Sequence, residues 1–263
     1  MCFVPSHTTT LVASSHSDSG DKRPINEDRV LIKKYSISNE PWGMFLVADG
    51  LGSNHNKVAS QMIVDHLSYW WDNDLATILS FPFQPDVVLS RLDEAIEKIN
   101  EKVFSVESER KIGSTLSLLL MMGDRYAIRH VGDSRIYLLN RHTGIHQLTT
   151  DHSYVATQVA AGLMSEEEAK VHPRRNVITR CIGMKSTVVM FSKEGIAKKD
   201  DMFLLCTDGF HNLISDSVIL DIVFSSELQI SEKVQILRKC IKRGVAHDNV
   251  SLVLVGNNTL RGE

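Results

Sequence analysis

The sequence predicts an α+β fold built on antiparallel sheets. Strand-like and helix-like segments arrive in blocks along the 263 residues and do not alternate strictly, which favours separate layers over a parallel doubly wound sheet. Two apolar runs meet at Gly123-Asp124, a two-residue connection that is typical of a β-hairpin. No linker or low-complexity tract interrupts the chain, so we expect a single domain over residues 1–263.

The first half of the chain predicts two blocks of strands separated by a pair of helices. Apolar and β-branched runs between polar or Gly/Pro-containing turns indicate the strands, and apolar residues at helical spacing indicate the helices. The predicted strands are 8–14, 29–35, 44–49, 114–122, 125–131, 135–140 and 145–149, and the predicted helices are 58–71 and 86–104.

The second half begins with a polar, basic-tipped segment at about 150–183, which is expected to form a surface flap between core strands. Within it, Ser165 and Glu168 fit a capping box at the start of a short helix that Pro173 ends. The remaining predicted elements are a strand over 202–207, helices over 216–224 and 232–242 with N-caps at Ser215 and Ser231, and a strand over 250–256.

Composition and charge argue against several classes of protein. The chain is 43% hydrophobic and carries 29 basic against 32 acidic residues, without a basic stripe, so no nucleic-acid partner is expected. No apolar run approaches the ~20 residues that span a bilayer, and the first residues lack a secretory signal pattern. The four scattered cysteines indicate small buried side chains and not disulfides or a zinc site. No membrane association and a cytoplasmic location are therefore expected.

Three aspartates lie at the ends of predicted buried strands. Asp49 and Asp208 each close an apolar run and are followed at once by Gly50 and Gly209, while Asp248 opens a run. A carboxylate in such a place is costly unless it is paired, and no Lys or Arg stands beside either strand-closing acid. Oxygen ligands without His or Cys at metal spacing are typical of Mg²⁺ or Mn²⁺. An isolated Asp-Gly pair is more often a simple turn, so the metal hypothesis depends on further acids.

Further acids lie in loops that the same site can gather. Arg23, Glu27 and Asp28 precede a predicted strand, and Asp133 lies at the junction between two others. Either group alone is compatible with solvated turns, but together with the strand-end aspartates they indicate a divalent-cation site in which Asp49 bridges two ions. Two such ions about 3.5–4 Å apart acidify a water molecule and neutralise charge on a phosphoryl group, so no enzyme nucleophile is needed.

A resemblance supports this interpretation. The ordered series R-x-x-N-E-D, F-L-V-A-D-G, G-S-T, V-G-D-S-R, F-L-L-C-T-D-G and D-N-V resembles the metal-dependent protein phosphatase family of the protein phosphatase 2C type, over about residues 8–256. The tract 148–162 is similar to the bacterial members that consist of the catalytic domain alone. The resemblance implies a four-layer α/β/β/α sandwich, in which two antiparallel sheets are flanked by helix pairs and the metals lie at one end.

The resemblance also implies a metal-ligand set. Asp49 would bridge two Mn²⁺ or Mg²⁺ ions and the carbonyl of Gly50 would bind one of them, while Asp208 and Asp248 would complete the other. Asp133, together with Asp208, would form a third, weaker site.

The same resemblance assigns the residues around the metals. Glu27 and Asp28 would hold metal-bound waters, and Arg23 would grip the substrate phosphate with its planar fork. Leu51 stands where related proteins often carry a histidine that is proposed as a general acid, so a metal-bound water is the expected proton donor here.

The predicted function is a serine/threonine protein phosphatase of one catalytic domain, expected to be a monomer that acts on products of a Ser/Thr kinase. None of the four cysteines is followed six residues on by Arg, which argues against cysteine-dependent phosphatase chemistry. No GxxxxGK[ST] cradle for nucleotide phosphates occurs either. Two alternatives stay open: a non-catalytic phosphoprotein-binding regulatory member of the same fold, and a metal-dependent hydrolase of small phosphoesters or nucleic acid.

Overall fold

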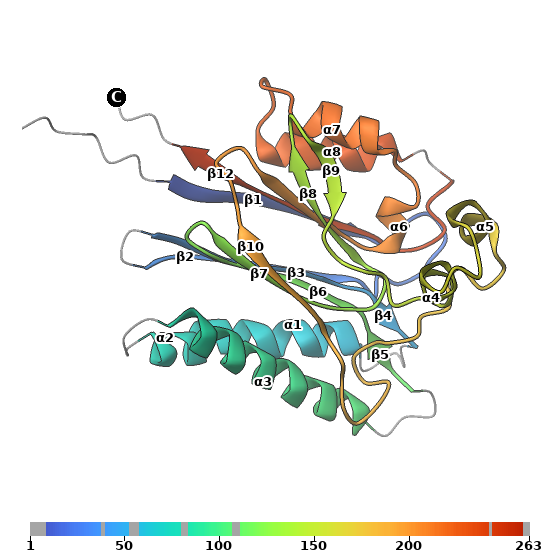
Figure 1. The fold of residues 1–263 in the computed structure, drawn as a ribbon, viewed down its shortest axis with the longest axis horizontal. Helices are drawn as coiled ribbons and strands as arrows, with labels where there is room; N and C mark the ends of the chain where they lie inside the picture. Colours follow the sequence, from blue (N-terminus) through green and yellow to red (C-terminus); the bar gives the residue numbers. More distant parts are fainter. Residues whose placement is uncertain are drawn as a thin grey trace, which may run out of the picture.

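The computed structural model describes residues 9–37, 40–52, 58–79, 84–106, 111–241 and 244–259. Two five-stranded antiparallel sheets lie face to face in the middle of the molecule (Figure 1). Helices α1 and α3 cover the outer face of one sheet, and α7 and α8 cover the outer face of the other. The predicted α/β/β/α sandwich is confirmed.

The first sheet has the strand order β1-β12-β11-β8-β9 and the second the order β10-β7-β6-β3-β2. Strands of the first sheet are β1 (Thr9–Asp18), β8 (Arg135–Asn140), β9 (Gly144–Gln147), β11 (Met202–Cys206) and β12 (Val250–Thr259). Strands of the second are β2 (Arg29–Ile37), β3 (Glu40–Ala48), β6 (Leu116–Met122), β7 (Arg125–Val131) and β10 (Phe191–Ile196). A short ladder joins β4 (Gly50–Leu51) to β5 (Gly113–Ser114).

The helices follow the predicted periodicity at most positions. Their bounds are α1 (Ala59–Tyr69), which continues through a π-helical segment (Trp70–Asp74) into α2 (Leu75–Ile78), α3 (Pro85–Phe104), α4 (Tyr154–Ala160), α5 (Glu166–Val171), α6 (Asp208–His211), α7 (Asp216–Val223) and α8 (Ile230–Cys240). Within the residues that the structure describes, no helix is both long enough and apolar enough to cross a membrane.

Apolar runs without polar alternation reflect strands that are covered on both faces. On β3, Phe45 and Val47 point into the layer between the sheets, whereas Met44 and Leu46 pack against α1 and α3. All four side chains are fully buried. Because both faces of the strand lose contact with water, an uninterrupted apolar segment can form a strand here.

Two local expectations need correction, and the N-cap at Ser215 is confirmed in position only. Strand β10 was not expected, because its sequence FSKEGI is polar and exposed along an edge where it pairs only with β7. Ser231 lies inside α8, whose N-cap is Gln229 in a capping box with Glu232. Ser215 occupies the N-cap position of α7, but its hydroxyl contacts Ser217 and makes no cap hydrogen bond. The capping box of Ser165 and Glu168 in α5 is confirmed.

Antiparallel pairing brings the predicted site residues to one end of the sandwich. In the first sheet, Cys206 at the end of β11 pairs with Arg135 at the start of β8 and with Leu252 near the start of β12. In the second sheet, Arg29 at the start of β2 pairs with Ala48 at the end of β3. The residues just outside these strand ends, Asp28, Asp49, Asp133, Asp208 and Asp248, therefore share one end of the molecule.

Candidate metal centre

Asp49 is held between β3 and β4 by hydrogen bonds from its own backbone. Its amide donates to Thr115 Oγ1 at 2.9 Å, and its carbonyl accepts from the Thr115 amide, also at 2.9 Å. The next residue has to be glycine, because a Cβ at Gly50 would lie 2.7 Å from the carbonyl oxygen of Glu27. This close approach brings the loop that carries Glu27 and Asp28 against the end of β3.

Two further glycines bring Asp208 and Asp248 together. Asp208 is the first residue of α6, and a Cβ at Gly209 would lie only 2.0 Å from the carbonyl oxygen of Asn249. A Cβ at Gly20, which has a φ of +67°, would lie 2.0 Å from the carbonyl oxygen of Asp248. The segment that carries Asp248 is thus enclosed on both sides by backbone that only glycine permits.

Several carboxylate oxygens of this cluster are buried without a partner. Among the residues described, Oδ1 of Asp28, of Asp133 and of Asp208 each lacks a hydrogen-bond partner. Asp28 and Asp133 are only 1% and 8% exposed, so water does not replace the missing partners fully. A buried unpaired carboxylate is costly, and several at one place suggest an unseen ligand of opposite charge.

The acids of this cluster lie close enough to repel one another. Burial, followed by the charges of Asp28, Asp208, Asp133 and Asp248, raises the pKa of the Asp49 carboxyl well above its ordinary value. Burial is also the main cause that raises the pKa of Asp28 and of Asp133 to about 7 and the pKa of Asp208 to about 6. Nearby carboxylates add to the rise in each case.

The donor set fits hard divalent cations, which prefer carboxylate and carbonyl oxygens. In the described ranges, however, no three His, Cys, Asp or Glu side chains form a ready-made cage around one point. Ions bound here would therefore take part of their coordination from other oxygen atoms, as Mg²⁺ commonly does with water.

Arg23 and Glu27 lie beside the acids. The Arg23 guanidinium donates to Asp248 Oδ2 at 2.9 Å, and its side chain is 54% exposed. This hydrogen bond raises the pKa of Arg23, and the charges of Asp49 and Glu27 raise it further. Arg23 is thus placed next to the carboxylates with a half-exposed side chain.

Three neutral residues hold the acids in place and were not singled out in the sequence. Thr115 binds the backbone of Asp49, and Thr207 Oγ1 donates to Asp28 Oδ2 at 2.8 Å. Asn249 accepts from the Glu27 amide at 2.8 Å and donates to two carbonyls of the 19–25 loop. Their positions inside the G-S-T, T-D-G and D-N-V motifs were the only available signal.

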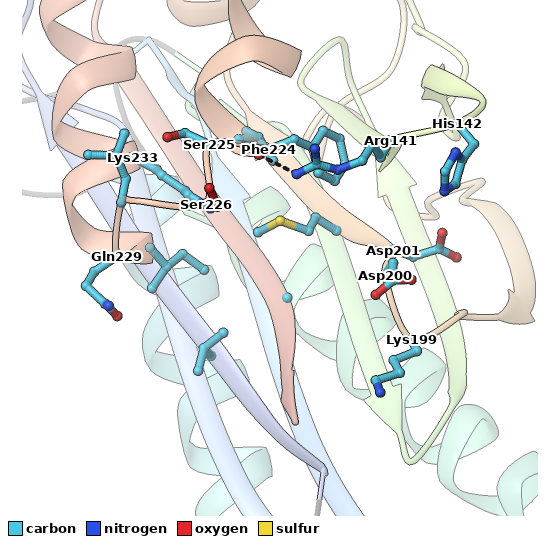
Figure 2. A pocket seen from close by; sticks show the side chains of 16 residues that line it. Arg141, His142, Lys199, Asp200, Asp201, Phe224, Ser225, Ser226, Gln229 and Lys233 are labelled. Carbon is cyan, nitrogen blue, oxygen red and sulfur yellow. Dashed lines mark hydrogen bonds between the residues drawn. The ribbon is translucent and has the colours of Figure 1, made fainter. Parts of the chain in front are cut away.

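A cavity of about 500 Å³ lies at the other end of the first sheet (Figure 2). It is lined by residues that follow β8 (Arg141), precede β11 (Lys199, Asp200) and lie late in β12 (Gly256), together with the connection between α7 and α8. None of the predicted site residues lines it. The acid cluster is therefore not part of this cavity.

Comparisons with known proteins agree with the geometry. The profile of the family described as Protein phosphatase 2C matches residues 14–243. Protein phosphatase PhpP of Streptococcus pneumoniae is 33% identical over 247 residues, which cover 92% of this chain and 96% of that protein. Serine/threonine phosphatase stp of Listeria monocytogenes is 32% identical over 248 residues, with 92% and 94% covered.

Solved structures share the fold. Serine/threonine phosphatase Stp1 from Staphylococcus aureus superposes with a TM-score of 0.81 at 26% identity, covering 94% of each chain. The catalytic domain of serine threonine protein phosphatase PstP, in complex with two manganese ions, superposes with a TM-score of 0.76 at 29% identity, covering 95% of this chain and 99% of that one. Fold and comparisons together define a metal-dependent protein phosphatase. The chain belongs to the protein phosphatase 2C family.

Proposed function

We propose that the chain is a serine/threonine protein phosphatase that hydrolyses phosphoserine and phosphothreonine esters at a centre of two Mn²⁺ or Mg²⁺ ions. The observation that carries the proposal is the set of buried, unpartnered oxygens on Asp28, Asp133 and Asp208 beside Asp49. Relatives named serine/threonine phosphatases support the substrate class, and the two manganese ions of PstP support the metal.

Four ligands would hold the ions: the carboxylates of Asp49, Asp208 and Asp248 and the carbonyl of Gly50. Bound divalent ions lower the pKa of water and neutralise charge on the phosphoryl group. Asp133, which shares repulsion with Asp208, would contribute to a third and weaker site. Glu27 and Asp28 would orient water by accepting hydrogen bonds.

Arg23 would bind the substrate phosphate. Within the described part of the chain Arg23 makes one hydrogen bond, to Asp248, which leaves donors for two phosphate oxygens. The bidentate geometry of guanidinium suits a phosphate. The exposed side chain can reach a phosphorylated residue on the surface of another protein. Leu51 next to the site offers no proton, so a water molecule held at the metal centre would protonate the leaving alkoxide.

The wider setting follows from the substrate class. The substrates would be phosphoproteins made by a Ser/Thr kinase, and the chain would act as a monomer in the cytoplasm. The buried free thiols of Cys181 and Cys206 support a reducing compartment. Residues 150–183 would form a flap at the edge of the site.

A phosphopeptide assay tests this function. Phosphate release should require Mn²⁺ or Mg²⁺, stop in EDTA, and fall by at least about a hundredfold in Asp208→Asn, which removes a ligand charge. The matched control is Asp201→Asn, which changes a buried aspartate at the opposite end of the first sheet. Full activity in EDTA or in Asp208→Asn would reject the metal mechanism. A wild-type protein that binds phosphopeptide without cleaving it would favour the non-catalytic regulatory alternative. Activity on small phosphoesters alone would favour the small-phosphoester hydrolase.

A further inference from the structure

A buried histidine beside the acid cluster has no role in the proposed chemistry. His130 is fully buried near the end of β7, and its ring has polar partners on both sides. Nδ1 lies 2.8 Å from the hydroxyl of Ser117, and Nε2 lies 3.1 Å from the carbonyl oxygen of Thr150. Burial and the nearby ring of His152 lower the pKa of His130 to about 4, so the ring is neutral near pH 7 and carries one proton.

On the Nδ1 side, hydrogen bonds continue to the metal centre. The Ser117 hydroxyl is within 3.1 Å of the carbonyl oxygen of Ser134, the residue after Asp133. The Ser134 hydroxyl is 2.7 Å from Thr115 Oγ1, which in turn accepts from the Asp49 amide at 2.9 Å. His130 is thereby connected, through three hydroxyl-bearing residues, to the backbone of Asp49.

On the Nε2 side, the ring contacts the beginning of the 150–183 segment. Next to Thr150, His152 stacks on His130 with ring centroids 5.0 Å apart. His152 is attached twice to Gly132, since its amide donates to the Gly132 carbonyl at 2.7 Å and its Nδ1 accepts from the Gly132 amide at 3.0 Å. Its carbonyl accepts from the amide of Thr179 at 2.7 Å, so both ends of the segment meet at this point.

The ring proton of His130 and the hydroxyl proton of Ser117 cannot reach both the Thr150 and the Ser134 carbonyls while Nδ1 stays hydrogen-bonded. With the proton on Nε2, the ring donates to Thr150, and the single hydroxyl proton of Ser117 goes to Nδ1 and not to Ser134. With the proton on Nδ1, the ring donates to Ser117, whose own proton then reaches Ser134, and the Thr150 carbonyl loses its donor. The two tautomers therefore favour different attachments, one to the 150–183 segment and one to the loop that holds Asp133.

We propose that His130 is a positioning residue of the phosphatase: its ring links the base of the 150–183 segment to the backbone of Asp49 and to the Asp133 loop. A shift of the segment at Thr150 changes which hydrogen bond the ring donates, and the change reaches Asp49 through Ser117, Ser134 and Thr115. The consequence for activity rests on the proposed function, whereas the link itself is present without metal or substrate.

Two substitutions separate the two sides of the ring. His130→Asn keeps a polar group near the Nδ1 position and removes the contact with Thr150, whereas His130→Gln keeps a donor near the Nε2 position and removes the contact with Ser117. The control is Ile128→Val, which alters a fully buried neighbour on the same strand but leaves the hydrogen bonds intact.

The kinetic test uses a phosphopeptide and the full chain. We expect kcat/KM to fall about tenfold in both His130 variants and to stay within about twofold in Ile128→Val. The fall should come mainly from kcat in His130→Gln, because Asp49 and the Asp133 loop lose their support, and mainly from KM in His130→Asn, because the segment is released. The proposal would be overturned if kcat and KM contributed to the fall in the same proportion in both His130 variants. It would also be overturned if neither variant lost more activity than Ile128→Val.

A spectroscopic test in metal-free protein separates this proposal from the phosphatase function. The backbone amide resonance of Asp49 should shift in His130→Gln, shift less in His130→Asn, which keeps the Nδ1 side, and stay in place in Ile128→Val. If the Asp49 amide resonance does not shift, the link is overturned, even if the protein is an active phosphatase. If the resonance shifts in a protein without phosphatase activity, the link is supported and the proposed function is rejected. If the His130 variants do not fold, Ser117→Ala takes their place with the same expected shift and the same contrary result.

Discussion

Buried aspartates at the two ends of the first sheet differ in their hydrogen bonding. At one end Asp201 is 5% exposed, and its two oxygens accept hydrogen bonds from Asn140 Nδ2 at 2.7 Å and from the Lys198 amide at 2.8 Å. At the other end Asp133 is 8% exposed, yet its Oδ1 has no partner within the described chain. The two aspartates are buried to a similar extent, but only Asp201 has hydrogen-bond partners for both of its carboxylate oxygens among the described residues.

The same contrast separates the ion pairs from the site. Asp18 binds Arg238, and Asp151 binds Arg135 through Oδ2 at 2.7 Å. The chain itself supplies a cationic partner for each of these two carboxylates, so no external ligand is needed to explain their positions. Of the site aspartates only Asp248 has such a partner, Arg23, whereas Oδ1 of Asp28, Asp133 and Asp208 has none among the described residues. These carboxylates also repel Asp49, which destabilises the metal-free fold.

The largest effect is expected where backbone approaches most closely. Gly209→Ala places a Cβ 2.0 Å from the carbonyl oxygen of Asn249, which belongs to backbone and cannot rotate away. We expect a loss of about 3 kcal/mol or more in the free energy of unfolding, together with loss of activity. Gly256→Ala, near the cavity end, meets the flexible side chain of Met202, whose terminal methyl is nearest at 3.0 Å, and should cost about 1 kcal/mol or less. Urea titration of both variants measures the difference in the free energy of unfolding. Equal losses would mean that the backbone is packed no more tightly at the acid end than at the cavity end.

Removing an aspartate should change stability in opposite directions at the two ends. In EDTA, Asp208→Asn removes one of several repelling buried charges and should raise the free energy of unfolding. Asp201→Ala leaves the Asn140 amide and the Lys198 backbone without their acceptor and should lower it by about 1–3 kcal/mol. Chemical denaturation of both variants in EDTA gives the sign of the change in the free energy of unfolding for each. A shift of the same sign in both would contradict the distinction.

The pH dependence of the free energy of unfolding should have opposite signs for the repelling acids of the site and for an acid in an ion pair. Asp28, Asp133 and Asp208 have a raised pKa, at about 7, 7 and 6 against an ordinary 3.8, so the folded metal-free protein binds more protons than the unfolded chain between about pH 4 and 7. Its free energy of unfolding should therefore fall as pH rises through that window. Urea unfolding in EDTA across this range measures the slope, which Asp133→Asn should reduce; a rising slope would contradict the repulsion.

Asp18 should titrate in the other sense. Burial alone would raise its pKa, but hydrogen bonds from Arg238, His16 and the Gly20 amide outweigh burial and lower it to about 2. Its contribution is present above about pH 4 and is lost as the pH falls towards 2. Arg238→Gln should remove that contribution, so the variant should lose less stability than the wild type on acidification to pH 2. An unchanged acid transition would show that the pair contributes nothing measurable.

The smallest effect on stability is expected at Arg23. Its pair with Asp248 is solvent-exposed, so Arg23→Ala should change the free energy of unfolding by no more than about 1 kcal/mol. KM for a phosphopeptide should nevertheless rise about tenfold, with Arg23→Lys in between because a lysine loses the bidentate fork. Steady-state kinetics with a thermal melt of each variant tests this, and an unchanged KM would remove Arg23 from phosphate binding.

Much of the fold was predictable because burial leaves a pattern in sequence. The strand expected over 125–131 and the helix expected over 86–104 agree with β7 and, within one residue, with α3. Each has one decisive signal, a two-residue hairpin turn or apolar residues at helical spacing. Strand β10 lacked such a signal, since an edge strand pairs on one side and its exposed residues need not be apolar.

For the site, the sequence by itself determined a set of candidate residues: acids at the ends of predicted strands, three of which, Asp49, Asp133 and Asp208, stand next to a glycine, can be recognised without coordinates. Only the tertiary structure decided which oxygens are satisfied and which are not. Thr207 donates to Asp28 across 179 residues of chain. His130 is connected to Asp49 through Ser117, Ser134 and Thr115, which come from two segments of the chain. Hydrogen bonds depend on distance and direction in space, and neither quantity is encoded by the local spacing of residues.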